Sequence, residues 1–179
     1  YTEAFLGNLT NPNFKPKYDS QQSIYRAINT LLTEAISDLS TPSSANLTPF
    51  GAASNDLIYS GTVANWIAAA HSLRARYALH LSNKGTVDYN AVLADCAAGI
   101  KSNANNFQVP FGITESNANP LYEFDQQRGD VATSPSFETF AAGDPRLAVF
   151  QDGSFGSFYG SINSPAPIIT YVETKFIEA

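Results

Sequence analysis

Apolar side chains recur at three- and four-residue steps in three segments of the chain, residues 19–40, 62–84 and 88–102. This spacing places the apolar positions on one face of an α-helix. No alternating strand pattern competes with it. The pattern therefore predicts a helical scaffold over residues 19–102 and an all-α fold class.

The first segment carries a long apolar face and a signal at each end. Asp19 or Ser20 can cap the helix, because a side-chain oxygen there accepts hydrogen bonds from the free N–H groups of the first turn. Thr41-Pro42 ends it, since the residue before proline avoids helical geometry. The positions expected to face the core are Ile24, Ile28, Leu31, Leu32, Ala35, Ile36 and Leu39.

The second and third segments are joined by a short link, which predicts an antiparallel helical hairpin. Gly85 provides a helix stop, and Asp88 can cap the third helix. Trp66, Leu73 and Tyr77 are expected to be largely buried. The complete predicted stripe of the second helix is Trp66, Ala70, Leu73, Tyr77 and Leu81.

Residues 103–164 have a different character, being rich in Asn, Gly, Ser, Phe and Tyr with weak periodicity. A structureless loop of this length is uncommon in a compact domain, so short helices are expected within it. One is predicted at about 134–142. Another is predicted at "DPRL", with Asp144 as the cap and Pro145 at the first helical position.

Residues 165–179 return to helical spacing, with Ile169, Val172 and Phe176 on one predicted face. The chain stops inside this pattern and opens on Tyr1 without a signal peptide. We therefore expect a single helical domain that is a fragment of a longer protein, ending in a truncated helix over 165–179.

Composition narrows the classes of function. The chain is 44% hydrophobic and 15% charged, which is typical of a folded domain. Its net charge is −6 and no basic stripe is visible, which argues against nucleic-acid binding. No apolar run approaches the roughly 20 residues needed to cross a bilayer. The single cysteine, Cys96, lies among small apolar residues and is expected to be a buried thiol.

The two histidines do not form a metal site. His71 and His80 are nine residues apart on one predicted helix, so at about 100° per residue they face opposite ways. Neither has an acidic residue at helical spacing, which favours structural or solvated histidines. Nucleophile, phosphate-loop and zinc-protease motifs are missing from the sequence. We expect no catalytic residue, metal or cofactor.

Charged residues beside the apolar stripes need partners. Arg74 and Arg76 lie at the edge of the second predicted helix's stripe, and Glu173 lies in the middle of the last one. An ion removed from water is stable only when it is paired. We therefore predict a salt bridge from Glu173 to Arg74 or Arg76, which would join the last helix to the second.

An ordered set of segments resembles the SusD/RagB family, and more narrowly its SusD-like branch. "NDLIYSGTVANWIAAAHSLRARYALHLSNKG" (55–85) is similar to the family pattern D-x-I-Y-x-G, a tryptophan, then S-L-R-x-R-Y-A. Departures are Thr62 where an acidic residue is common, Ala64-Asn65 where a lysine often precedes the tryptophan, and His71 where Asn is usual. The other segments that carry the resemblance are "YDSQQSIYRAINTLLTEAISDL" (18–39), "NPLYEF", "DPRLAVF" and "PIITYVETKFIEA".

The resemblance implies an outward-facing outer-membrane lipoprotein of a Bacteroidetes-type bacterium. Such a protein is tethered by an N-terminal lipidated cysteine, which this chain does not contain. It captures oligosaccharides or other nutrients and caps a TonB-dependent, SusC-like barrel. Its scaffold consists of tetratricopeptide-like helix pairs with an irregular ligand-bearing region. The implied function is binding rather than catalysis.

Two alternatives remain open from the residues alone. A generic helical-repeat scaffold would bind protein segments along a concave face. A carbohydrate-active enzyme would need only two suitably spaced carboxylates. The irregular region supplies Glu115, Glu123, Asp125 and Asp130.

The irregular region also has the side chains that a sugar site needs. A sugar presents apolar C–H faces ringed by hydroxyl groups, so flat aromatic rings beside amides and charged groups can hold it. The family motif assigns none of these positions a binding role, so the hypothesis rests on composition, and the rings could instead pack the loop onto the helices. The candidates are Asn119, Tyr122, Phe124, Asp125, Arg128, Phe155, Phe158 and Tyr159.

Overall fold

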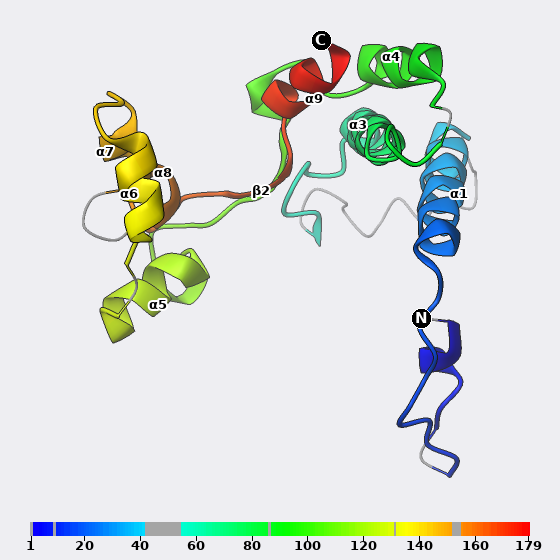
Figure 1. The fold of residues 1–179 in the computed structure, drawn as a ribbon, viewed down its shortest axis with the longest axis horizontal. Coiled ribbons are helices and arrows are strands. Elements are labelled where there is room, and N and C mark those ends of the chain that lie inside the picture. The colour runs from blue at the N-terminus through cyan, green and yellow to red at the C-terminus, as the bar shows by residue number, and fades with distance from the viewer. Residues whose placement is uncertain (1, 9, 42–54, 86, 131, 152–154) are drawn as a thin grey trace. The chain divides into compact units, whose positions relative to one another are not determined.

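The computed structural model describes residues 2–8, 10–41, 55–85, 87–130, 132–151 and 155–179 (Figure 1). They divide into two compact units. The helical unit draws on residues 1–47, 62–105 and 171–179, and the second unit on 48–61 and 106–170. Helices dominate the described residues, which confirms the predicted all-α class.

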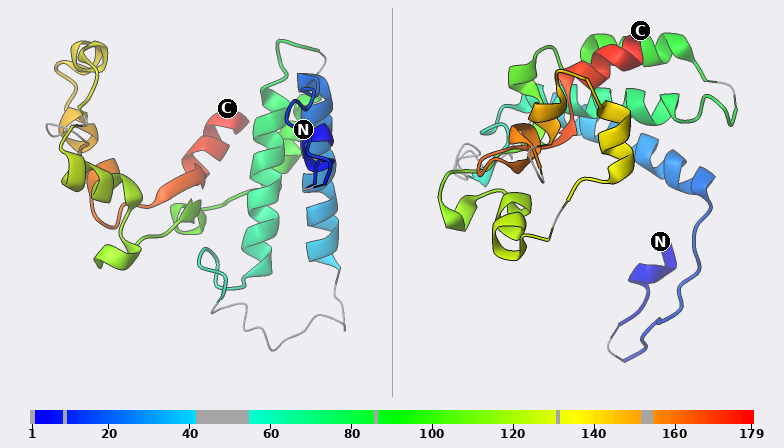
Figure 2. Two further views of the ribbon diagram at one scale, coloured as in Figure 1. Left: turned by 90° about the horizontal axis from the view of Figure 1, so that it is seen from below. Right: turned by 60° about the vertical axis from the view of Figure 1, so that its left-hand side comes forward.

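The helical unit is built around α3 (Val63–Leu79). This helix packs against α1 (Gln21–Ser40), α4 (Tyr89–Ala98) and α9 (Tyr171–Glu178). Figure 2 shows α1 and α3 side by side. The 3₁₀-helices η1 (Thr2–Phe5) and η3 (Asn103–Asn105) belong to the same unit. The three long predicted helices therefore exist, with shorter bounds for the second and third.

Both predicted caps are present in the helical unit. The Ser20 side chain accepts a hydrogen bond from the Ser23 N–H, and the Asp88 carboxylate accepts one from the Ala91 N–H at 3.1 Å. The third helix ends at Ala98 rather than 102. Its chain leaves helical geometry there because the Ile100 N–H donates to Ser72 Oγ of α3, at 2.9 Å. This contact holds the end of α4 against the middle of α3, and the two helices pack against each other across a short link, as in an antiparallel hairpin.

The buried face of α3 consists of small residues, Ala69, Ala70, Ser72 and Ala75. Ala75 packs with Val92 and Cys96 of α4, so the cysteine is buried as expected. Trp66, Leu73 and Tyr77 are partly buried beside this face, which agrees with the prediction that they are largely buried, although the fully buried positions belong to the small residues. Small side chains let α4 and α9 approach α3 closely and leave the larger ones at the sides.

The predicted apolar face of α1 is less buried than its pattern indicated. No residue of α1 is fully buried, and Leu31 is 64% exposed. The reason is that α1 packs mainly against one neighbour, α3. A single helix covers only part of a wide apolar face. Tyr25 makes one of these contacts, with its ring edge-on to that of Tyr77 at 6.0 Å between centroids.

Residues 165–179 do not form one helix, contrary to prediction. Strand β2 (Ala166–Ile169) pairs antiparallel with β1 (Phe107–Val109), and α9 begins only at Tyr171. Prolines at 165 and 167 oppose a helix there, because proline lacks an N–H donor and restricts the preceding residue. Ile169 is fully buried as a strand residue, whereas Val172 and Phe176 are exposed.

The second unit contains short helices, as expected for residues 103–164. They are η4 (Glu115–Asn117), α5 (Pro120–Arg128), α6 (Pro135–Ala141), α7 (Leu147–Phe150) and α8 (Ser157–Gly160). The α6 helix follows its predicted bounds closely, and its cap is Ser134, which accepts from the Phe137 N–H.

Two details of this unit differ from expectation. Helix α7 begins at Leu147, because the Asp144 carboxylate accepts the Arg146 N–H at 2.8 Å in a tight turn ahead of the helix. Helix α5 was not predicted, although its signals are local. Pro120 stands at its start, and Gly129 ends it in the left-handed conformation at φ 61°.

The predicted ion pair between the last helix and the second is present. Arg76 Nε and Nη2 donate to the two carboxylate oxygens of Glu173, each at 2.5 Å. This paired geometry is the strong form of an arginine–carboxylate contact. The Arg76 side chain is 17% exposed, whereas that of Glu173 is 39% exposed, so solvent weakens the pair.

We expect Glu173→Gln to lower the free energy of unfolding by about 1 kcal/mol, because the pair is bidentate but partly screened by water. Denaturant unfolding at low and high salt measures this difference, and salt should reduce it. Glu34→Gln, an exposed carboxylate on α1, is the matched control. Equal effects of the two substitutions would show that the Arg76–Glu173 pair does not contribute to the free energy of unfolding.

Candidate functional site

Helix α5 is fastened to the chain after α8 by Asn119. The Asn119 Oδ1 accepts the Leu121 N–H at 2.7 Å and caps the helix, while Nδ2 donates to the Ser164 carbonyl at 2.6 Å. The Asn119 N–H also donates to the Ile162 carbonyl. This side chain is buried and engaged at both ends, so it positions α5. Its predicted contact with ligand stays a prediction.

Helix α5 presents an aromatic ring and a cation together. Phe124 is 47% exposed, and the Arg128 guanidinium lies 5.7 Å from the centre of its ring. Arg128 also forms an exposed ion pair with Asp130 at 3.1 Å. Tyr122 and Asp125 are partly buried on the same helix. An exposed ring beside a guanidinium provides both stacking and hydrogen-bond donors.

A second group of rings lies on α8 and α7, and we call Phe150, Phe158 and Tyr159 the aromatic platform. The Phe158 and Tyr159 rings meet edge-to-face at 4.7 Å between centroids, and Phe150 of α7 lies 6.2 and 6.4 Å from them. Phe158 is 53% and Tyr159 43% exposed, so part of each side chain remains accessible to a ligand. Phe155 is partly buried.

The structure brings the two groups into one unit. Helix α8 contacts both α5 and α7, although the sequence separates α5 from α8 by more than one other helix. Exposed rings, a guanidinium and carboxylates therefore occur on neighbouring helices. Broad aromatic faces with polar groups beside them are the chemistry that retains a sugar through its C–H faces and hydroxyl groups.

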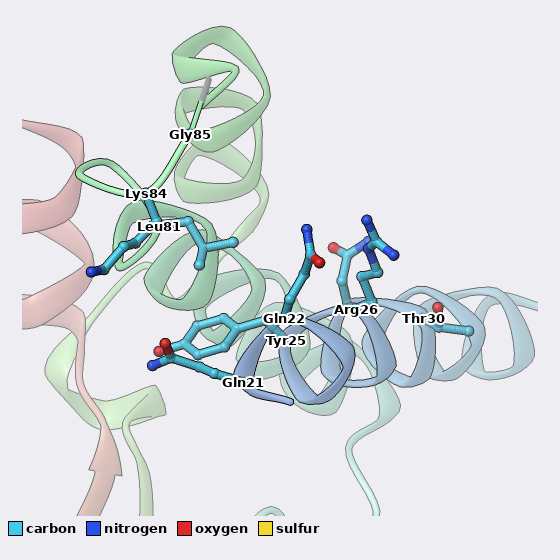
Figure 3. Close-up of a pocket in the computed structure, with 9 residues that line it drawn as sticks. Gln21, Gln22, Tyr25, Arg26, Thr30, Leu81, Lys84 and Gly85 are labelled. Atoms are coloured by element: carbon cyan, nitrogen blue, oxygen red, sulfur yellow. The ribbon is translucent and has the colours of Figure 1, made fainter. Parts of the chain in front are cut away.

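A cavity of about 700 Å³ lies in the helical unit, between α1 and the segment that follows α3 (Figure 3). Figure 3 shows Gln22 and Arg26 projecting from α1, with Leu81 and Lys84 on the facing segment. The sequence does not reveal this cavity, because polar residues on one helix face follow the same pattern whether they line a hollow or only meet solvent. The lining residues are Gln21, Gln22, Tyr25, Arg26, Asn29, Thr30, Leu81, Lys84 and Gly85.

A charged cluster centred on Asp95 lies where α3 packs against α4. Its carboxylate accepts from Arg74 Nε and Nη2 at 2.8 and 2.6 Å, and lies 2.8 Å from His71 Nδ1. Burial raises the pKa of Asp95, but hydrogen bonds and charge from Arg74 and His71 outweigh it and hold the pKa below its usual value. The sequence did not reveal Asp95 as the partner of Arg74, because the two residues lie on different helices.

The histidines have the structural surroundings that the sequence indicated. His71 faces Asp95, while His80 Nδ1 lies 3.5 Å from the Tyr25 hydroxyl on another side of α3. Within the part of the chain that the structure describes, no group of three or more His, Cys, Asp or Glu residues is placed to hold a metal ion. The described helices also include none with the length and apolarity needed to cross a membrane.

Comparison with known proteins identifies the family. Residues 1–161 match the model of the SusD-like family described as starch-binding and associating with the outer membrane, and the chain belongs to this family. No curated protein matches the chain.

Two solved structures share the fold. A SusD/RagB family protein from Bacteroides thetaiotaomicron is 23% identical, with a TM-score of 0.72 over 97% of this chain and 43% of that one. A chitin-binding SusD homologue from Flavobacterium johnsoniae is 18% identical, with a TM-score of 0.68 over 89% of this chain and 39% of that one. The chain thus spans less than half the length of these structures.

Proposed function

We propose that this protein binds a glycan nutrient at the outer membrane, and that the aromatic platform and the exposed side chains of α5 make contact with the glycan. The observation that supports this most directly is the pair of exposed rings, Phe158 and Tyr159, next to α5 in a chain of the SusD-like family. Tyr159 adds a hydroxyl group to its ring, and Arg128 adds donors for sugar hydroxyls.

The proposal includes the place of binding in the cell. A protein of this family would be held at the cell surface by a lipid anchor and would pass its glycan to a TonB-dependent barrel. Membership in a family whose description includes outer-membrane association supports this placement. Co-purification of the full-length protein with a barrel from the outer-membrane fraction is the direct test, and recovery of the protein in the soluble fraction alone would contradict it.

Tyr159→Ala should weaken glycan binding about tenfold, equivalent to about 1.4 kcal/mol, and should hardly change the melting temperature, because the ring is 43% exposed. Calorimetric titration of the full-length protein with chitin and starch oligosaccharides measures the affinity. Phe140→Ala is the matched control, since Phe140 is 90% exposed on α6 and lies outside the platform.

Equal affinities of the Tyr159 and Phe140 variants would contradict the proposed site. Chromatography of the same mixtures separates binding from the alternative of a carbohydrate-active enzyme. Oligosaccharides of unchanged length support a binding protein, and shorter products would indicate hydrolysis by a carboxylate pair. Loss of folding in the Tyr159 variant, seen by calorimetry, would show that the ring packs the unit and does not bind ligand.

A further inference from the structure

We propose that the cavity between α1 and the segment after α3 is a second binding site, and that it takes the carboxylate of an acidic saccharide such as a uronic acid. This site is separate from the aromatic platform. Only the saccharide part of the proposal rests on the proposed glycan binding. The recognition of a carboxylate rests on the cavity itself.

The size of the cavity suits a small ligand. Its volume of about 700 Å³ falls within the roughly 300–1,000 Å³ of typical small-molecule sites. A smaller hollow of about 120 Å³ shares Tyr25, Asn29 and Leu81 with it and extends the space between α1 and α3. A mono- or disaccharide fits these dimensions.

The charge of the cavity differs from that of the chain. Arg26 of α1 and Lys84 of the segment after α3 are among its lining residues, and none of the nine is acidic. In the described residues, neither cation forms an ion pair. The whole chain has ten basic and sixteen acidic residues. A hollow with two unneutralised cations in an acidic protein concentrates anions locally.

The remaining lining matches the other groups of a sugar. Gln21, Gln22 and Asn29 offer amide donors and acceptors, which can pair with hydroxyl groups in either direction. Gln22 and Arg26 project from the same face of α1, one helical turn apart (Figure 3). Tyr25 adds an aromatic ring, itself held edge-on against Tyr77. An arginine can bind a carboxylate through two parallel hydrogen bonds.

The test uses the full-length protein with four probes: digalacturonate, a neutral disaccharide, succinate and a chitin oligosaccharide. The variant is Arg26→Gln with Lys84→Gln, and the matched control is Lys15→Gln with Lys17→Gln, which removes the same charge from exposed positions. All four substitutions lie at exposed positions, so thermal unfolding should be unchanged. Titration at low and moderate salt measures each affinity.

We expect digalacturonate to bind the wild type and the control at least tenfold more tightly than the Arg26/Lys84 variant, with affinity that falls as salt rises. Equal binding to variant and control would overturn the site, and equal binding of the neutral disaccharide would overturn the role of the carboxylate. If succinate bound as tightly as digalacturonate, the proposal that the ligand is a saccharide would be overturned. The chitin oligosaccharide reports on the aromatic platform, so its binding to the Arg26/Lys84 variant separates failure of this proposal from failure of the proposed function.

Discussion

Asp95→Ala will lower the free energy of unfolding by about 3 kcal/mol, the lower end of the range for breaking a buried ion pair. The Asp95 side chain is 9% exposed and that of Arg74 24%, so the charge left behind is largely removed from water. Arg74 would retain a hydrogen bond to the Thr33 hydroxyl at 3.2 Å, which replaces only part of what it loses. Denaturant unfolding at neutral pH measures the change.

Two comparisons identify the origin of this effect. The double variant Asp95→Ala, Arg74→Ala should be less destabilised than the sum of the single variants, because the second substitution removes the stranded cation. Asp130→Ala removes a solvent-exposed pair with Arg128 and should leave the unfolding midpoint nearly unchanged. Additive single effects, or an equal loss at Asp130, would show that burial of the Asp95 cluster does not matter.

The Asp95 carboxylate also makes the stability of the protein depend on pH in the acidic range. Because the folded-state pKa of Asp95 lies below that of the unfolded chain, about 3.9, its contribution is complete above that pH. The contribution is lost as the pH falls through the folded-state pKa. Wild-type stability should therefore decrease more steeply below about pH 4 than that of Asp95→Ala. Parallel profiles would contradict the ion pair.

Gly99→Ala will lower the free energy of unfolding by about 2–3 kcal/mol, since overpacking and a broken buried hydrogen bond combine. A β-carbon at this position would lie 2.4 Å from Ser72 Oγ and 3.1 Å from the Asp95 carbonyl oxygen. The hydroxyl cannot turn away freely, because it accepts the Ile100 N–H at 2.9 Å and the Thr174 hydroxyl at 3.0 Å. These contacts join α3, the end of α4 and α9.

Gly85→Ala is the matched control, since a β-carbon there meets nothing within 4 Å. It should stay within about 0.5 kcal/mol of the wild type, the usual range for surface substitutions. The double variant Ser72→Ala, Gly99→Ala should lose less unfolding free energy than the sum of the two single variants. The first substitution removes the oxygen with which the new β-carbon at position 99 would clash. Equal stability of the Gly99 and Gly85 variants would show that the end of α4 can move away from Ser72 of α3 without loss of stability.

Local patterns in the sequence were sufficient for the helices of the scaffold and their caps. Ser20 and Asp88 each accept a hydrogen bond from an N–H group only three residues away, so a short stretch of sequence contains both partners. Helix α5 was missed despite similar signals, since its apolar residues do not form a regular stripe. The residues of the aromatic platform were identified by composition, but their exposure and the contact of α5 with α8 were not.

The sequence by itself determined the helical class, the places where the long helices begin and the family. Tertiary structure decided which residues fill the core, because small side chains on α3 are buried only by the close approach of α4 and α9. It also decided the partner of Arg74, the pairing of β1 with β2, and the cavity beside Arg26. Asp95 is 21 residues from Arg74, and Thr174 is 102 from Ser72. Periodicity records only which side of its own helix a residue occupies, so contacts at such separations depend on how whole elements pack.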